Sequence, residues 1–151
     1  MIATFREATA EDLAKWLALR KELWPECSIE RHELEIEQLT SSEGLVVFAD
    51  VNNDLVGFAE VSIRRDHVEG TSHSPVPYLE GWYVREAFRD KGIGSGLLSY
   101  VEEWAVSKGY RQLASDAELV NTLSIDLHRR LGFSEVGRSV HFVKGLESPA
   151  P

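Results

Sequence analysis

The stretch Arg89-Asp90-Lys91-Gly92-Ile93-Gly94 decides the fold, because it joins an apolar run ending at Val84 to an amphipathic segment from Ile93 to Lys108. This order predicts a strand, a glycine-containing turn and the N-terminus of a helix. Several backbone N–H groups at a helix N-terminus lack an intrahelical acceptor, and the helix dipole adds partial positive charge there. The turn is therefore predicted to bind a phosphate group.

The spacing of the glycines excludes the two best-known phosphate-binding loops. A P-loop has the pattern G-x-x-x-x-G-K-[ST], and a dinucleotide-binding loop has G-x-G-x-x-G followed by an acidic residue. Neither pattern occurs in this sequence. At this point an ordinary polar turn, in which Gly92 and Gly94 serve only the backbone, stays open as an alternative.

Length and composition indicate one globular domain. The chain has 151 residues, 43% of them hydrophobic and 27% charged, which is an ordinary balance for a globular protein of this size. We expect residues 1–146 to form a single domain and residues 147–151 to form a frayed C-terminal tail. The start of the chain lacks the pattern of a signal peptide, and no apolar run is long enough to cross a membrane. The expected location is the cytoplasm.

Charge and cysteine content exclude other classes of protein. The net charge of -9 argues against binding to nucleic acid, which is held by basic surfaces, and favours a cationic substrate, although an acidic surface also serves solubility. Cys27 is the only cysteine, so an internal disulfide and a cysteine-based metal site are impossible. The histidines are scattered without the spacing of a zinc site, and we expect no metal.

Periodicity and turn residues predict an α/β (α+β) fold with a mixed central sheet of six to seven strands and four helices in the order βααβββαβαββ. The fourth and fifth strands, joined through a helix, are expected to be parallel. The predicted strands are residues 2–7, 45–51, 55–64, 78–84, 112–116, 134–137 and 140–144. The predicted helices run from a capping box at residues 9–12 to residue 23, and over residues 28–40, 93–108 and 122–131.

Two segments resemble the GCN5-related N-acetyltransferases (GNAT). The loop from Arg89 to Gly94 is similar to their R/Q-x-x-G-x-G/A motif, and the segment Asn121–Phe133 is similar to their N-x(6)-Y-x-x-x-G-F element. The resemblance implies splayed fourth and fifth strands that form a slot for acetyl-coenzyme A (acetyl-CoA). His128 stands where most members have the tyrosine thought to protonate the leaving thiolate, and histidine is also able to donate a proton. A His128 that contacts only solvent or cofactor stays open as an alternative.

The resemblance also implies which residues contact acetyl-CoA. The pyrophosphate would lie on the loop, the thioester carbonyl would meet the backbone of the fourth strand, and the pantetheine arm would bond to Asn121. The expected cofactor-binding residues are Trp82, Tyr83, Val84, Arg89, Asp90, Lys91, Gly92, Ile93, Gly94, Ser95 and Asn121.

Nearly the whole chain is similar to the aminoglycoside 6'-N-acetyltransferases. The similar segments are Leu23-Trp24-Pro25 and the runs of residues 57–64, 79–84 and 114–116. The resemblance implies transfer of an acetyl group from acetyl-CoA to the 6'-amine of aminoglycoside antibiotics, which confers resistance. It implies an acceptor site of Trp24, His67, Glu80 and Asp116, with His67 and Gly137 departing from the related pattern.

A protonated amine has no lone pair, so the acceptor must lose a proton before it attacks the thioester. The expected catalytic residues are Glu80 and Asp116, as carboxylates that bind the ammonium groups and accept the proton, and His128 as the acid. Each carboxylate has the alternative of a structural role. Direct transfer in a ternary complex is expected, because Cys27 as a plain structural cysteine is favoured over a covalent intermediate.

Three functions remain open from the sequence. The first is an aminoglycoside acetyltransferase, the second an acetyltransferase of another small amine such as a polyamine, and the third a non-catalytic acyl-CoA sensor. Related enzymes are often dimers, and the closing strands between Val136 and Lys144 are able to pair across an interface, so a homodimer is expected.

Overall fold

In this computed structural model, residues 2–148 are described, and the chain divides into two compact units, Met1–Asp116 and Ala117–Pro151. The two units are treated separately below. Residues 149–151 of the predicted tail lie outside the described residues. Among the described residues, no helix combines the length and the apolar character that a membrane span requires.

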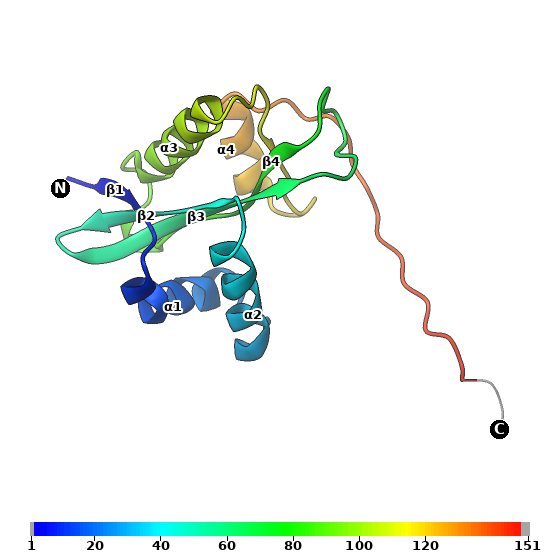
Figure 1. Ribbon diagram of the computed structural model, residues 1–151, viewed down its shortest axis with the longest axis horizontal. Coiled ribbons are helices and arrows are strands. Elements are labelled where there is room, and N and C mark those ends of the chain that lie inside the picture. The colour runs from blue at the N-terminus through cyan, green and yellow to red at the C-terminus, as the bar shows by residue number, and fades with distance from the viewer. Residues whose placement is uncertain (1, 149–151) are drawn as a thin grey trace. The chain divides into compact units, whose positions relative to one another are not determined.

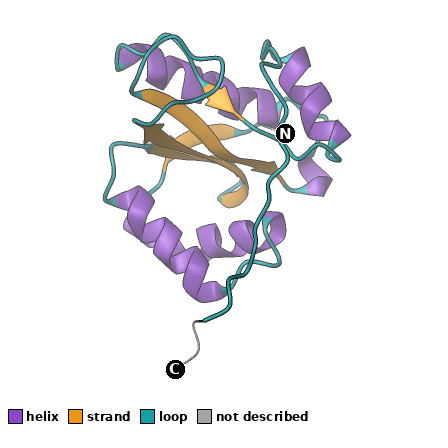
Figure 2. Ribbon diagram, turned by 90° about the vertical axis from the view of Figure 1, so that its right-hand side faces the viewer, coloured by secondary structure: helices purple, strands orange, loops and turns teal. Residues whose placement is uncertain are grey.

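The first unit is a twisted five-stranded sheet with helices on both faces (Figures 1 and 2). Helices α1 and α2 lie on one face and α3 lies on the other (Figure 1). The strands are β1 (Thr4–Glu7), β2 (Leu45–Val51), β3 (Asp54–Arg64), β4 (Val76–Val84) and β5 (Ala114–Ser115). The helices are η1 (Ala10–Asp12), α1 (Leu13–Leu23), α2 (Ile29–Thr40), η2 (Glu86–Phe88) and α3 (Ile93–Ser107).

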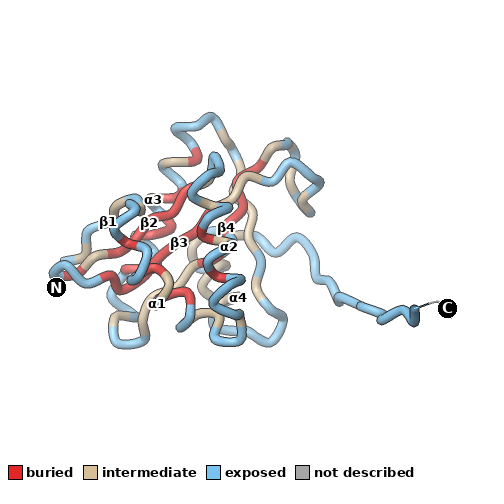
Figure 3. The backbone as a smooth tube through the Cα atoms, turned by 60° about the horizontal axis from the view of Figure 1, so that its bottom comes forward, coloured by how far each residue is buried: buried red, intermediate tan, exposed pale blue. Residues whose placement is uncertain are grey.

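Burial of apolar side chains on both faces of the sheet holds these layers together. The buried residues run along β2, β3 and β4 (Figure 3). Trp16 of α1 packs edge-on against Phe48 of β2, at 5.9 Å between ring centroids, and Leu97 and Val101 of α3 are fully buried. A Cβ on Gly96 would lie 2.2 Å from Cζ of Phe5, so α3 approaches β1 closely only because this residue is glycine.

The sheet order is β1-β2-β3-β4-β5, antiparallel except for the parallel pair β4 and β5. The predicted parallel pairing is thus confirmed. Only two residue pairs join these strands, Tyr78 with Ala114 and Leu79 with Ser115, whereas β4 continues to Val84. The paired region is therefore confined to the beginning of β4.

The second unit contains α4 (Thr122–Arg130), which Asn121 caps by accepting a hydrogen bond from the N–H of Ser124 at 3.1 Å. The prediction of closing strands at 134–137 and 140–144 is wrong for the described structure, which has five strands in place of six to seven. A strand requires a backbone ladder, and the apolar side chains of this segment face solvent; Phe142 is 92% exposed and Val143 is 98% exposed. Sequence alternation predicted strands, but the single chain forms no ladder here.

An ion pair at the start of α1 makes stability depend on pH. Asp12 is 8% exposed and accepts bonds from Arg6 at 2.8 and 2.9 Å and from the N–H of Thr9 at 2.8 Å. The bonds from Arg6 hold the pKa of Asp12 well below its usual range near 4. A depressed carboxyl pKa contributes stability that is present above the unfolded pKa and is lost as the pH falls toward the folded one.

We therefore expect Asp12→Asn to lower the free energy of unfolding at pH 7 by about 1 kcal/mol, because the neutral amide loses the ion pair with Arg6. Between pH 5 and pH 3 the variant should lose less stability than the unaltered protein. Urea unfolding at several pH values measures both effects. The neighbouring exposed Glu11→Gln is the control, and an equal pH dependence in the protein and the Asp12 variant would contradict the assignment.

Candidate active site

The loop that was predicted to bind phosphate lies between β4 and α3. Gly92 is the N-cap residue of α3 and has φ +80°, a left-handed conformation that glycine adopts without strain. The first bond of the helix runs from the N–H of Gly96 to the carbonyl of Gly92. The N–H groups of Ile93, Gly94 and Ser95 precede this bond and therefore belong to the first turn, whose donors have no acceptor within the helix. This is the geometry of an anion site.

Side chains around this loop tie it to the end of β4. The indole N–H of Trp82 donates to the carbonyl of Gly94 at 2.9 Å, and Nε of Arg89 donates to the carbonyl of Val84 at 2.8 Å. The ammonium of Lys91 lies 6.0 Å from the ring centroid of Phe88. The loop thus carries two cations beside a helix N-terminus, and both favour an anionic ligand.

Glu80 is placed by a β-bulge in β4. Along the β3–β4 ladder Gly81 pairs with Glu60 and Leu79 pairs with Val61, so Glu80 is the extra residue between them. Bulges redirect side chains and are frequent beside active sites. The Glu80 side chain is 31% exposed, although its neighbours in the strand are buried.

The Glu80 carboxylate is bound by two side chains of β3. The hydroxyl of Ser62 donates to Oε2 at 2.5 Å, and Arg64 donates from Nε to Oε2 at 3.1 Å and from Nη2 to Oε1 at 2.6 Å. The hydrogen bond to Glu80 and the negative charges of Glu80 and Asp116 raise the pKa of Arg64 against the opposing effect of burial. Glu80 is therefore part of a bidentate ion pair.

Asp116, which follows β5, accepts a hydrogen bond of 2.5 Å from the hydroxyl of Tyr78 in β4. Burial, together with this bond to the carboxylate, raises the pKa of the Tyr78 hydroxyl. Tyr78 consequently remains protonated near neutral pH and acts as the donor. The guanidinium carbon of Arg64 lies 3.4 Å from the Tyr78 ring centroid, so Arg64 and Tyr78 link the two predicted carboxylates.

Trp24 lies against the same strand at Gly81. A Cβ on Gly81 would be 2.6 Å from Cη2 of Trp24, so the absence of a side chain at Gly81 lets the indole rest on the backbone of β4. The indole also packs edge-on against Phe58, at 6.1 Å between centroids. Trp24 therefore contacts β4 at Gly81, the residue after Glu80, and Asp116 is joined to the same strand through Tyr78.

A buried polar cluster contacts both the ring and the backbone of Trp24. The Arg20 guanidinium carbon lies 4.7 Å from the Trp24 ring centroid and pairs with Glu60 at 2.7 Å, and His32 Nε2 lies 3.2 Å from the Trp24 carbonyl. Burial raises the pKa of Glu60, while the charge of Arg20 and the bond from Trp16 oppose that rise. The cluster holds both the ring and the backbone of Trp24.

The other predicted site residues have contacts of their own. His67 is 80% exposed on the β3–β4 loop, and its recorded partner is Glu69 at 3.8 Å. Asn121 and His128 belong to the second unit, where His128 Nδ1 lies 2.7 Å from the Ser124 carbonyl and its ring is 4.9 Å from that of Phe133. Tyr83 donates to Glu22 at 3.0 Å. The roles of these residues stay predictions.

Sequence reasoning missed Ser62, Arg64, Tyr78 and Gly81. Ser62 and Arg64 alternate along one strand, as do Tyr78 and Glu80, and alternation places such pairs on a common face. That signal was available in the sequence. The cross-strand partners were not, because the bulge at Glu80 changes the register.

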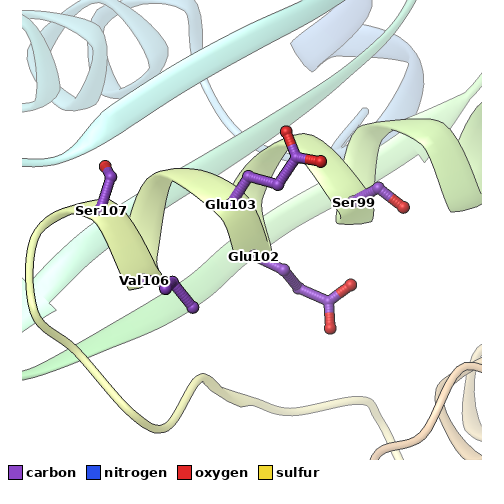
Figure 4. A pocket seen from close by; sticks show the side chains of 5 residues that line it. All are labelled: Ser99, Glu102, Glu103, Val106 and Ser107. Atoms are coloured by element: carbon purple, nitrogen blue, oxygen red, sulfur yellow. The ribbon is translucent and has the colours of Figure 1, made fainter.

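An open depression elsewhere on the first unit is distinct from this site. It lies on α3, and its five lining residues are Ser99, Glu102, Glu103, Val106 and Ser107 (Figure 4). All five belong to α3 and come after its first turn, which is the turn that adjoins the phosphate-binding loop. The depression therefore shares no residue with the site built from β3, β4 and the loop.

The sequence profile of the Acetyltransferase (GNAT) family matches residues 10–133, which include the loop, the bulged strand and α4. The chain belongs to the GNAT acetyltransferase family. It is 42% identical over 148 residues to "Aminoglycoside N(6')-acetyltransferase type 1" of Stenotrophomonas maltophilia, covering 97% of this chain and 96% of the relative.

Two solved structures are similar over nearly the whole chain. The structure of AAC(6')-Iy in complex with the bisubstrate analog CoA-S-monomethyl-acetylneamine superposes with a TM-score of 0.90 at 34% identity, covering 97% of this chain and 100% of that one. AAC(6')-Ih of Acinetobacter baumannii, an aminoglycoside antibiotic 6'-N-acetyltransferase, gives 0.87 at 36% identity, with coverage of 97% and 100%. The predicted GNAT fold is confirmed.

Proposed function

We propose that the chain is an aminoglycoside 6'-N-acetyltransferase that transfers the acetyl group of acetyl-CoA directly to the acceptor amine in a ternary complex. The observation that carries this proposal is the similarity to relatives of that activity over 97% of the chain. The acidic acceptor region formed by Glu80 and Asp116 supports it, because aminoglycosides are polycations. Acetylation of the drug by this enzyme would confer resistance.

The donor side of the proposal rests on the loop and α3. The N–H groups of Ile93, Gly94 and Ser95, with Arg89 and Lys91 beside them, suit the pyrophosphate of acetyl-CoA. Trp82 to Val84 would flank the pantetheine arm, and the side-chain amide of Asn121 would bond to it. Acetyl-CoA supplies the activated acetyl group, and the protein orients it toward the acceptor; the proposal contains no metal ion.

On the acceptor side, Asp116 accepts the proton of the reacting ammonium, directly or through a water molecule, and Glu80 binds a second ammonium. Trp24 supplies an aromatic face for a sugar ring, and His67 completes the acceptor site from its loop. His128 protonates the leaving thiolate.

A transfer assay tests the proposed function. Thiol release from acetyl-CoA is measured with kanamycin, amikacin, gentamicin and spermidine, with EDTA included to exclude a metal requirement. We expect turnover with at least one aminoglycoside and product acetylated at the 6'-amine. Preference for spermidine would indicate a polyamine acetyltransferase, and cofactor binding without any turnover would indicate an acyl-CoA sensor.

We further propose a cytoplasmic homodimer with a single GNAT domain, residues 1–146, in each subunit. Support for the dimer comes from residues 134–144, where Val140, Phe142 and Val143 are 69%, 92% and 98% exposed. β5 is the last strand in the sheet order. Pairing of residues 134–144 with a second copy would complete their backbone ladder and bury these side chains.

Phe142→Ser is expected to shift the dimer to monomer. Because a twofold interface buries each residue twice, loss of about 1.5 kcal/mol per phenylalanine raises the dissociation constant roughly 100-fold. Light scattering after size exclusion, over a range of micromolar concentrations, measures it. Leu123→Ser, at an 80% exposed position of α4, is the control. A monomeric unaltered protein at all concentrations would contradict the dimer.

A further inference from the structure

Arg64 holds Glu80 in the way that a substrate ammonium would hold it. Both carboxylate oxygens accept bonds from its guanidinium, at 3.1 Å from Nε to Oε2 and at 2.6 Å from Nη2 to Oε1. Ser62 adds a third bond, at 2.5 Å to Oε2. An acceptor ammonium that approaches Glu80 therefore meets a carboxylate that already carries a cation.

Hydrogen-bonding capacity makes the two cations competitors. A carboxylate offers about four acceptor positions, and three bonds are already made to Glu80. An ammonium group brings three N–H donors. One remaining position takes a single N–H, so a substrate ammonium that engages both oxygens of Glu80 competes with the bonds from Arg64.

The surroundings of Arg64 make that release inexpensive. Its side chain is 42% exposed, so water screens the ion pair and solvates the guanidinium when its bonds to Glu80 are released. Its guanidinium carbon also lies 3.4 Å from the ring centroid of Tyr78. This cation–π contact does not depend on Glu80, so the released guanidinium keeps a partner. Ser62 remains on Glu80 and preserves the direction of the carboxylate.

We propose that Arg64 is a specificity-determining residue: an internal cation that holds Glu80 until an acceptor with more than one ammonium displaces it. This inference rests on the proposed function, because it takes Glu80 as an acceptor-binding carboxylate. An acceptor whose only ammonium is the reacting one brings no second cation to displace Arg64 and is repelled by its charge. A polycation brings a second ammonium to Glu80 and is favoured.

Arg64→Gln tests the proposal, because glutamine removes the charge and retains a hydrogen-bond donor. We expect the KM for neamine to fall roughly two- to fivefold, the range of an exposed ion pair, with kcat and the KM for acetyl-CoA unchanged. The KM for the monoamine glucosamine should fall by a larger factor. Arg65→Gln is the matched control: Arg65 is the next residue, is 61% exposed and pairs with Glu43, so it removes the same net charge.

A higher KM for neamine in Arg64→Gln, or equal changes in the Arg64 and Arg65 variants, would overturn the proposal. Should the Arg64 variant misfold, the unaltered protein decides: its Arg64 Nε–H NMR resonance, assigned with Arg64→Lys, should shift on saturation with neamine, and an unmoved resonance counts against displacement. Calorimetric titration with neamine separates a failure of the Arg64 proposal from a failure of the proposed function. Binding without acetylation defeats the proposed function but still tests Arg64, whereas absence of binding defeats both.

Discussion

Gly92→Val is expected to reduce acetyl-CoA affinity about 100-fold or more. Gly92 has φ +80° at the N-cap of α3, a conformation that costs a β-branched residue roughly 1–3 kcal/mol. The loop would relieve that strain by turning its N–H groups away from the pyrophosphate, and each lost bond to a charged group costs about 1.5–3 kcal/mol. Calorimetric titration with acetyl-CoA measures the loss.

The chain offers a closely matched control for this experiment in Gly109. It follows the same helix at its other end, has φ +89°, and like Gly92 has no atom within 4 Å of an added Cβ. Gly109→Val should therefore lose a similar amount of thermal stability and keep its acetyl-CoA affinity. If both variants bind acetyl-CoA normally, or both lose it equally, the loop is not a specific pyrophosphate site.

Local sequence chemistry predicted most helices and turns of the fold. The predicted helix at 93–108 is α3 at 93–107, and Ser28 caps α2 by accepting from the N–H of Arg31 at 3.1 Å. Asn52 and Asn53 have φ 52° and 66°, the values that a tight hairpin requires. Each of these features depends on a few adjacent residues, which is why the sequence was sufficient.

Features that depend on pairing between distant segments were not predictable in the same way. The bulge that turns Glu80 outward arises from the register of two strands, and nothing in the sequence of either strand requires it. In the predicted closing strands the sequence pattern is present, but the strands are absent from the described residues. Alternation of apolar residues between 134 and 144 is visible in the sequence, but alternation alone supplies no partner for the backbone.

The candidate site combines both cases. The resemblance to the aminoglycoside 6'-N-acetyltransferases pointed to Glu80 and Asp116, and the acidic net charge favoured a cationic acceptor. The side chains that govern these carboxylates, Arg64 and Tyr78, became evident only from contacts across the sheet. The sequence therefore predicted an acidic site, and the structure showed which side chains bind its two carboxylates.

Asp116→Asn is expected to lower kcat for aminoglycosides roughly 100- to 1,000-fold, within the usual contribution of a general base. The amide cannot accept the proton of the reacting ammonium, whereas its oxygen still accepts the hydrogen bond from Tyr78, so the local structure persists. Acetyl-CoA affinity should change less than twofold, because the loop and α3 are untouched. Initial rates with kanamycin and calorimetry with acetyl-CoA measure the two effects.

Two companion variants assign the role of Asp116. Glu80→Gln removes an ammonium-binding charge and is expected mainly to raise the KM for kanamycin, while kcat falls much less than in Asp116→Asn. Asp54→Asn, at the opposite end of β3 from Arg64, removes the same charge far from Glu80 and should change neither parameter. Equal kcat in Asp116→Asn and the unaltered enzyme would remove Asp116 from the reaction. A dominant loss of kcat in Glu80→Gln would transfer the role of base to Glu80, since the residue that accepts the proton must govern the chemical step.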